Sequence, residues 1–243
     1  MHELWITKLC NQLLAGPANA VLQLAGIHAE DASKPWSNYM AMLMLVVVIF
    51  LLLPVLVRTG LSMDRPGKLQ QIFEVIYQFL ADLAHEIIGH GSQKHVAFFV
   101  TLFLFVLVCN LVGIIPSLES PTMFAPVPLG IAVFTFLYYN LYGFAEQGLI
   151  GYLKHFAGPI WWLAWFMFPL EIISHLVRPV SLTIRLFANM LAGEQVTIGF
   201  LSLVPLAVPV AFMGLHVFVS FVQAFIFTVL AIVYVAGAVE HEH

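Results

Sequence analysis

The sequence predicts an all-α polytopic membrane protein. We expect five membrane-crossing helices, the last two long and strongly tilted as a hairpin, plus one amphipathic interfacial helix. Of the 243 residues, 61% are hydrophobic and 9% are charged, and the mean hydropathy is +0.97. Because a soluble globular chain carries roughly 25% charged residues, nine Lys and Arg cannot cover a water-facing surface of this size. The uncharged runs between them are long enough for the roughly 20-residue helices that cross a bilayer.

The same composition excludes several functional classes. The net charge of -4 offers no basic face for nucleic acid. Cys10 and Cys109 are too few and too far apart for a disulfide framework or a thiolate metal site. His85 and His90 resemble a zinc-protease signature but lie five residues apart. Because that spacing is about 140° around a helix, they cannot bind one metal from one face. We expect no catalytic residues, no metal and no cofactor.

Three uncharged runs predict the first three crossing helices: Trp36–Val57, Val96–Leu118 and Ser120–Ala145. Since no water is available in the hydrocarbon core, backbone groups there must bond within a helix. We expect residues 1–35 to form an external N-terminal tail and residues 36–243 to form a single membrane domain.

The segment Lys68–Gly91 alternates polar and apolar residues with a helical period. This pattern predicts an amphipathic helix at the membrane interface rather than a crossing helix. The expected apolar face holds Ile72, Val75, Ile76, Phe79, Leu80, Leu83 and Ile87, and the polar residues are Glu74, Gln78, Asp82 and Glu86.

The last two helices are predicted over Phe168–Leu203 and about Pro209–Gly237, within a hairpin of about residues 160–237. The first of them has a length of about 54 Å, which greatly exceeds a core of about 30 Å. It must therefore be strongly tilted or broken, and Pro179 is an obvious place for a bend.

The distribution of basic residues predicts the orientation. Five lie in connections on one side and two in the N-terminal tail, which favours the N-terminus outside and the C-terminus in the cytoplasm. The five are Arg58, Arg65, Lys68, Lys94 and Lys154, and the two are Lys8 and Lys34.

Polar residues form stripes on both long helices. At 100° per residue, those of the first share a stripe about 120° wide. His216, Ser220 and Gln223 share a face of the second. The stripe on the first comprises Glu171, Ser174, His175, Arg178, Ser181, Arg185 and Asn189.

Two readings of the stripe's arginines are open. Arg178 and Arg185 either pair with acidic residues of the same helix or reach toward the interface, or they line a path through the membrane. Arg185 lies about 21 Å along the helix from Glu171, near mid-depth, which favours the second reading for it. Glu194 and His216 are candidates for a protonatable pair, because modest pKa shifts would let either exchange protons near neutral pH.

Four segments of the sequence resemble segments of a known protein family. Order, spacing and topology together resemble subunit a of F-type ATP synthases, and the segments cover most of the chain from about residue 98 onward. They are Arg178–Glu194 (RPVSLTIRLFANMLAGE), Gln223–Leu230 (QAFIFTVL), Asn110–Pro116 (NLVGIIP) and Tyr152–Pro159 (YLKHFAGP).

The resemblance implies a non-catalytic stator subunit that forms two half-channels for protons beside a rotating ring of c subunits. Arg185 matches the essential arginine, which attracts the ionised carboxylate of each passing c subunit and blocks leakage between the half-channels. Glu194 and His216 match the outer half-channel, and Gln223 matches the neighbour of the arginine. The other matching positions are Glu171 and Ser174, toward the inner side, and Asn189, which orders water.

The resemblance also implies partners and a location. The expected partners are the c ring, the peripheral-stalk b subunits, the rest of the complex, the lipid bilayer and protons. Asp82 and Glu86 either contact the stalk or form a solvated face. The order of Glu194 before His216 and the lack of a presequence favour a bacterial plasma (inner) membrane. Residues 117–128 depart from the family pattern, and Glu119 is their only ionisable group.

A secondary ion transporter with a mid-membrane Arg, Glu and His site is the alternative. Such proteins show internal repeats or paired broken helices. No repeat is visible here, and five crossings do not divide into equal halves.

Overall fold

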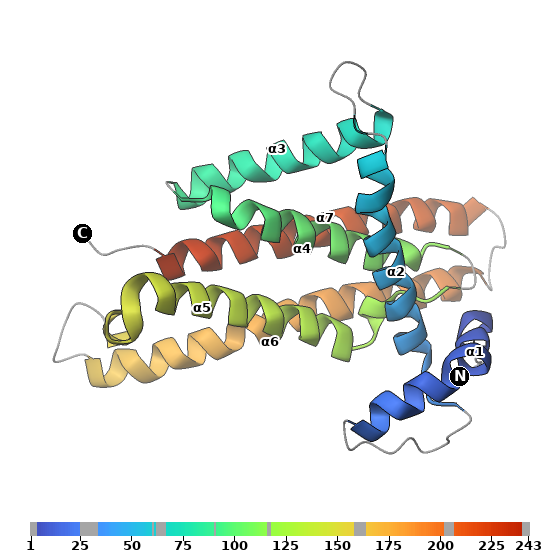
Figure 1. Cartoon of the computed structure of the whole chain (residues 1–243), viewed down its shortest axis with the longest axis horizontal. Coiled ribbons are helices and arrows are strands. Elements are labelled where there is room, and N and C mark those ends of the chain that lie inside the picture. The colour runs from blue at the N-terminus through green and yellow to red at the C-terminus, as the bar shows by residue number, and fades with distance from the viewer. Residues whose placement is uncertain are drawn as a thin grey trace.

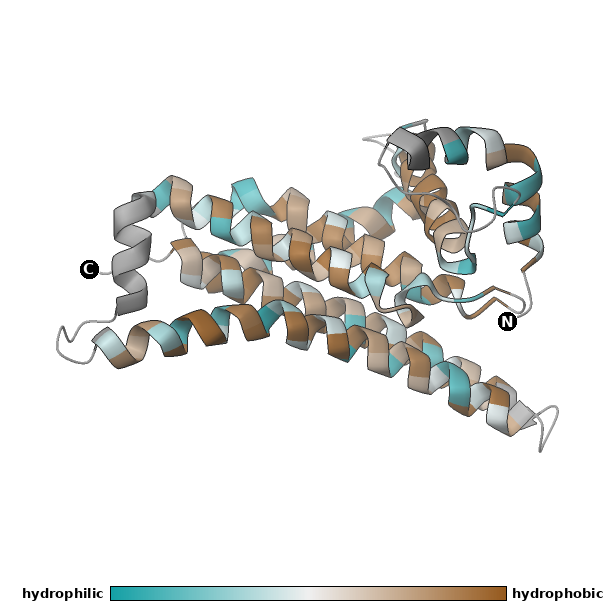
Figure 2. Ribbon diagram, turned by 90° about the horizontal axis from the view of Figure 1, so that it is seen from below, coloured by the Kyte–Doolittle hydropathy of each residue, from teal (hydrophilic) through white to brown (hydrophobic). Residues whose placement is uncertain are grey.

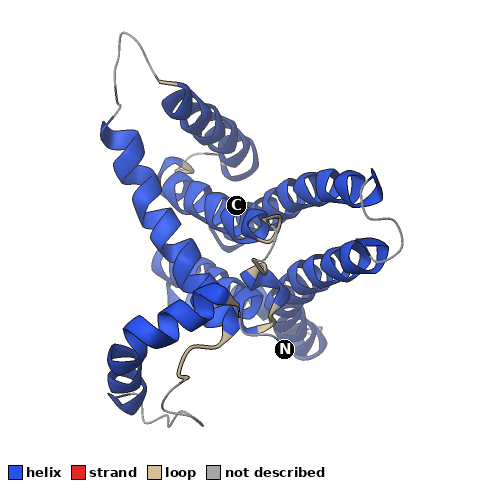
Figure 3. Ribbon diagram, turned by 90° about the vertical axis from the view of Figure 1, so that its right-hand side faces the viewer, coloured by secondary structure: helices blue, strands red, loops and turns tan. Residues whose placement is uncertain are grey.

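The structure is a computed structural model that describes residues 4–24, 34–59, 61, 67–89, 91–115, 118–157, 164–201 and 207–239. Figure 3 shows that the regular elements of this part of the chain are helices, which confirms the predicted all-α class. They are α1 (Trp5–Leu24), α2 (Asn38–Thr59), α3 (Lys68–Ile88), α4 (Gln93–Val112), the 3-10 turn η1 (Pro121–Met123), α5 (Pro126–Ala157), α6 (Ala164–Leu201) and α7 (Ala207–Val239).

Four helices among the described residues are long and apolar enough to cross a membrane, and each overlaps a predicted crossing helix. Hydrophobic residues dominate these helices in Figure 2. The fifth predicted crossing helix, α6, is outside this set, and it carries four charged side chains. The four spans are Asn38–Arg58, Gln93–Val112, Pro126–Glu146 and Val210–Val239.

Helix α6 is continuous over 38 residues, through both Pro169 and Pro179. The helix is therefore not broken at Pro179, where the sequence suggested a bend. At 1.5 Å per residue, α6 has a length of about 57 Å, nearly twice the thickness of a hydrocarbon core.

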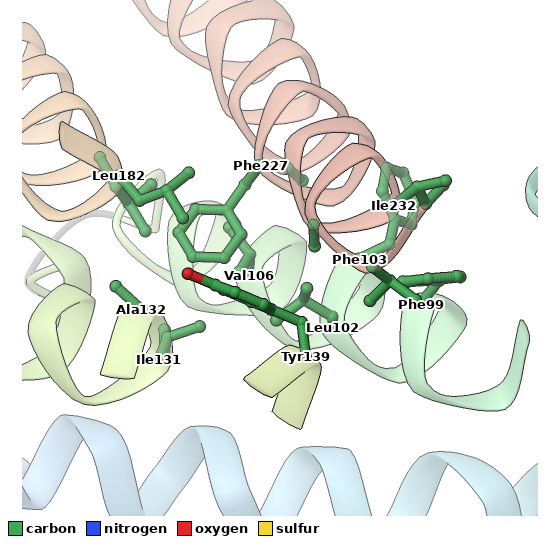
Figure 4. Close-up of a cluster of buried hydrophobic side chains, with 14 of the residues drawn as sticks. Phe99, Leu102, Phe103, Val106, Ile131, Ala132, Tyr139, Leu182, Phe227 and Ile232 are labelled. Carbon is green, nitrogen blue, oxygen red and sulfur yellow. The ribbon is translucent and has the colours of Figure 1, made fainter. Parts of the chain in front are cut away.

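Helices α3 to α7 run roughly side by side, and α2 crosses them (Figure 1). Helix α5 packs along α6, and α7 packs against α4, α5 and α6. Figure 4 shows the core where α4, α5, α6 and α7 meet. Side chains of all four helices in this core are at most 3% exposed, among them Phe99 and Phe103 of α4, Tyr139 of α5, Leu182 of α6 and Phe227 of α7.

The predicted amphipathic helix is present as α3, and only part of its apolar face is covered. Leu80 and Ala84 are fully buried in the core cluster. Ile72, Val75 and Phe79 are all more than half exposed. The covered part packs against α4 and α7, whereas the remaining apolar side chains are open to a lipid or protein environment.

The N-terminal segment contains a helix that the sequence did not predict. Helix α1 packs against the start of α2. The Thr7 hydroxyl donates to Asn38 Oδ1 at 3.0 Å, and the Trp36 amide donates to Asn11 Oδ1 at 2.9 Å. Residues 4–24 are therefore attached to the membrane helices through specific contacts.

The connection between α4 and α5 differs from the predicted boundaries. The helix predicted to continue to Leu118 ends at Val112, and the next begins at Pro126 rather than at Ser120. The intervening chain folds back onto the end of α4. A Cβ atom on Gly113 would lie 2.7 Å from Ser120 Cβ and 3.0 Å from the Ser120 amide nitrogen. Only glycine permits this approach.

Gly113→Ala is expected to destabilise the chain by about 1–3 kcal/mol, because the added methyl group overpacks against backbone that cannot move freely. Gly130→Ala is a matched control, since nothing lies within 4 Å of a Cβ there. The measurement is the thermal inactivation midpoint of the complex in membranes. Equal midpoints for the two variants would show that the contact between Gly113 and Ser120 leaves room for a methyl group.

Candidate functional site

Arg185 lies in the middle of α6, at the edge between its buried and open faces. Leu182 and Leu186 are at most 2% exposed on the side that meets the core. Ala188 and Ala192 are exposed on the other side, and Arg185 itself is half-buried. Among the residues that the structure describes, no side chain forms an ion pair or hydrogen bond with Arg185. Its charge is thus available to a group outside the chain.

Arg178 is different. Its Nη2 atom lies 3.6 Å from Glu171 Oε1, and its guanidinium carbon lies 5.1 Å from the centroid of the Tyr234 ring on α7. An arginine that faces an aromatic ring gains cation–π attraction in addition to its ion pair. For Arg178 the pairing considered from the sequence is therefore present, whereas Arg185 does not pair with Glu194.

A group of polar side chains surrounds Glu171 near the start of α6. His175 Nδ1 lies 3.9 Å from Glu171 Oε1, and both side chains are partly buried. We call Glu171, His175 and Arg178 the Glu171 cluster. Ser174, which is also half-buried, directly precedes His175 in the chain.

The far end of α6 forms a pocket with the first half of α7. Its volume is about 250 Å³, and Asn189 and His216 both line it. A Cβ atom on Gly193 would lie 3.1 Å from His216 Cε1, so the absence of a side chain at Gly193 lets the imidazole pack against α6. The pocket, called here the α6–α7 pocket, is lined by Asn189, Ala192, Gly193, Val196, Thr197, Phe212, Leu215, His216 and Val219.

His216 is the titratable group of the α6–α7 pocket. Its Nε2 atom is buried and has no hydrogen-bond partner among the described residues. A buried polar atom without a partner is costly, so a water molecule is favoured at this nitrogen.

Glu194 follows Gly193 but is not among the residues that line the pocket. Helix α6 packs against η1, and Glu119 in the loop before η1 is close enough to interact electrostatically with Glu194. Burial raises the pKa of the Glu119 carboxyl, and a hydrogen bond with the Asn38 side chain partly opposes this. The structure thus brings Asn189 and His216 together and sets Glu194 near Glu119.

Gln223 is 6% exposed on α7, two turns beyond His216. Between them, the Ser220 carbonyl accepts a 3.4 Å hydrogen bond from the Asn110 amide group. The Thr122 hydroxyl donates to Asn110 Oδ1 at 2.7 Å, and its oxygen lies 2.7 Å from that of Ser120. This buried network joins α4 and η1 to the segment of α7 that carries both candidate residues.

Comparison with known proteins identifies the family. The family described as ATP synthase A chain matches residues 39–236. The chain belongs to this family. An ATP synthase subunit a of Solibacter usitatus (strain Ellin6076) is 54% identical over 233 residues, which cover 96% of this chain and 99% of that protein. An ATP synthase subunit a of Koribacter versatilis (strain Ellin345) is 48% identical over 242 residues, which cover 100% and 99%.

Family membership confirms the resemblance seen in the sequence. The chain is a subunit a of the F-type ATP synthase, a multi-pass protein of the membrane sector through which protons cross. In this family member, no group of three His, Cys, Asp or Glu side chains that could hold a metal ion occurs within the described ranges.

Two features of this subunit a were not predicted from the sequence. The sequence did contain a clue to the network through Asn110 and Thr122, because asparagine is unusual at a buried position of an apolar helix. His175 was noted only as part of a stripe, and its 3.9 Å approach to Glu171 follows from their four-residue spacing on one helix face.

Proposed function

We propose that Arg185 is the fixed charge that meets the carboxylate of each c subunit as the ring turns, and that two half-channels lead to it. The guanidinium without an acidic partner in the described chain is the observation that supports this most. An arginine within the membrane costs about 3 kcal/mol on insertion scales. A carboxylate from a neighbouring subunit offsets that cost.

The strength of this pair suits a rotating contact. At an effective dielectric constant of 20, opposite charges about 4 Å apart attract by about 4 kcal/mol. This holds a ring carboxylate in its ionised form near Arg185 without preventing its release. Arginine stays charged at every relevant pH, so protons cannot pass through it from one half-channel to the other.

The outer half-channel leads through the α6–α7 pocket. His216 supplies a titratable nitrogen with no hydrogen-bond partner among the described residues, and Asn189 supplies an amide that can orient water. Glu194 and Glu119 form an acidic entrance beside it. Gly193 lies about 12 Å along α6 from Arg185, so the pocket reaches toward the arginine.

The inner half-channel leads to the opposite end of α6. Glu171 and Ser174 mark its exit, and Glu171 lies about 21 Å along the helix from Arg185. Gln223 is buried in the middle of α7. Its amide group supplies a polar side chain on the part of α7 that packs near Arg185. Protons enter by one path, travel on the ring and leave by the other.

This function requires five crossings, with α6 and α7 as a tilted antiparallel hairpin. Their side chains meet in antiparallel order: the rings of Phe200 and Phe212 are stacked 4.7 Å apart at one end, and Arg178 meets Tyr234 at the other. A helix of about 57 Å fits a core of about 30 Å only when strongly tilted. The N-terminus lies outside and the C-terminus in the cytoplasm of a bacterial plasma membrane.

The partners follow from the open faces. The c ring contacts the face of α6 where small side chains, Ser181, Ala188 and Ala192, are exposed beside Arg185. The peripheral-stalk b subunits contact the exposed apolar residues of α3. The chain forms one membrane domain from residue 36 onward and carries no catalytic site, because ATP chemistry belongs to the head of the complex.

Disulfide cross-linking tests the ring contact. Ala188→Cys is expected to cross-link to a cysteine placed beside the ring carboxylate, since Ala188 is exposed one turn from Arg185. Leu51→Cys on α2, 65% exposed, is the control and is expected to give no product. A sample without introduced cysteines accounts for Cys10 and Cys109. Cross-linking at Leu51 but not at Ala188 would contradict the proposed ring face.

A further inference from the structure

The Glu171 cluster contains a titratable side chain to which the proposed half-channels give no role. His175 is four residues beyond Glu171, and its side chain is 13% exposed against 35% for Glu171. Along the helix axis, His175 is about 6 Å closer to Arg185 than Glu171 is. A proton that moves along α6 from the level of Arg185 toward Glu171 therefore reaches the level of His175 first.

The geometry allows proton exchange between the two side chains. Nδ1 of His175 and Oε1 of Glu171 are 3.9 Å apart. This is too long for a direct hydrogen bond but short enough for one bridging water molecule or a small side-chain movement. The same oxygen lies 3.6 Å from Arg178, which attracts its negative charge and keeps the carboxylate oriented toward the histidine.

Two aromatic side chains of α5 pack against His175. The ring of Tyr139 on α5 approaches edge-on, with centroids 5.5 Å apart, and Phe136 lies 6.2 Å away. Tyr139 is 1% exposed and packs against Tyr234 of α7. Aromatic rings therefore form part of the wall around the imidazole, and Glu171, the more exposed of the two side chains, lies between it and water.

Several titratable or charged side chains of the described residues lie around His175. They include Glu171 and Arg178 on α6, Tyr139 on α5 and, behind Tyr139, Tyr234 on α7. Tyrosine ordinarily titrates near pH 10, and arginine stays charged. Of these side-chain types, imidazole is the one whose ordinary pKa lies nearest to neutral pH.

We propose that His175 is a proton-transferring residue of the inner half-channel. Its imidazolium gives the Nδ1 proton to the Glu171 carboxylate, directly or through one water molecule. The products are a neutral imidazole and a carboxylic acid, and the acid then releases the proton to water. The reverse sequence operates when the ATP synthase pumps. This inference rests on the proposed function, since it requires protons to pass along α6 between Arg185 and Glu171.

ATP-driven proton pumping in inverted membrane vesicles tests the inference, because protons then enter from the medium through the inner half-channel. His175→Gln keeps the size and hydrogen bonding of the side chain but cannot titrate. We expect pumping to fall by about tenfold, since a positioned acid–base group contributes at least that much. The profile between pH 6 and 8 is expected to lose the inflection that belongs to histidine. His85→Gln, on an exposed part of α3, is the control and keeps the normal profile.

Chemical rescue separates proton transfer from a packing role. His175→Ala is expected to regain pumping when imidazole is added, whereas loss that imidazole does not restore would assign His175 a structural role and overturn the inference. A normal rate and pH profile for His175→Gln would overturn it as well. Arg185→Ala, measured in parallel, reports on the proposed function separately, because coupled pumping in that variant would contradict the half-channels themselves.

Discussion

Arg185→Ala is expected to abolish proton-driven ATP synthesis in sealed membrane vesicles that hold the complete complex. Without the guanidinium, no fixed charge attracts the ionised ring carboxylate, and nothing separates the two half-channels. The interaction lost is worth about 4 kcal/mol at an effective dielectric constant of 20, which corresponds to a factor of nearly a thousand. The catalytic head, once detached, is expected to hydrolyse ATP at the normal rate.

Arg178→Ala is the matched control, because it removes the same side chain from the same helix two turns away. Arg178 already pairs with Glu171 and Tyr234, so its loss affects the Glu171 cluster and not the ring contact. We expect synthesis to decrease but to remain measurable. Equal losses in the two variants, or normal synthesis in Arg185→Ala, would contradict the distinction between a paired and an available arginine.

The second large effect is expected at the α6–α7 pocket. His216→Gln and Glu194→Gln each remove a titratable group from the outer half-channel and are expected to slow proton uptake by at least about tenfold. In inverted vesicles the outer half-channel opens to the interior, so the internal pH is the variable to scan. The rate of ATP synthesis under an imposed proton gradient is the measurement, and its dependence on the internal pH is expected to shift.

Val219→Ala is the control for the pocket, since Val219 lines the same cavity and cannot titrate. It changes the cavity volume and is expected to leave the pH dependence unchanged. If His216→Gln and Glu194→Gln also leave the rate and its pH dependence unchanged, neither residue belongs to the proton path.

The crossing helices could be predicted because their signal is composition over about 20 residues. Helix α1 could not. Its polar residues and Pro17 make it a weak helix by propensity, and contacts such as Thr7 with Asn38 stabilise it. The early end of α4 at Val112 accompanies a backbone contact, the return of Ser120 onto Gly113. Local hydrophobicity does not encode either contact.

The site shows the same division. Helical spacing set Arg178 and Arg185 on one polar stripe, and depth along the helix favoured a role in the proton path for Arg185. The aromatic partner of Arg178 could not be predicted, because Tyr234 is 56 residues from Arg178 in the sequence and meets it only through the packing of α7 on α6. Similarly, the sequence made Glu194 and His216 candidates for a protonatable pair, but only the packing of α7 on α6 shows that the imidazole of His216 lies against Gly193, the residue before Glu194.

Proton flux through membranes stripped of the catalytic head tests the role of Arg185 most directly. In a chain with the Ala188→Cys cross-link to the ring, rotation is blocked, and flux is expected to stop when Arg185 is present. With Arg185→Ala in the same cross-linked chain, flux is expected to continue, because protons then pass between the half-channels without rotation. Flux that stops in both chains would contradict the proposal that the available charge of Arg185 keeps the two half-channels apart.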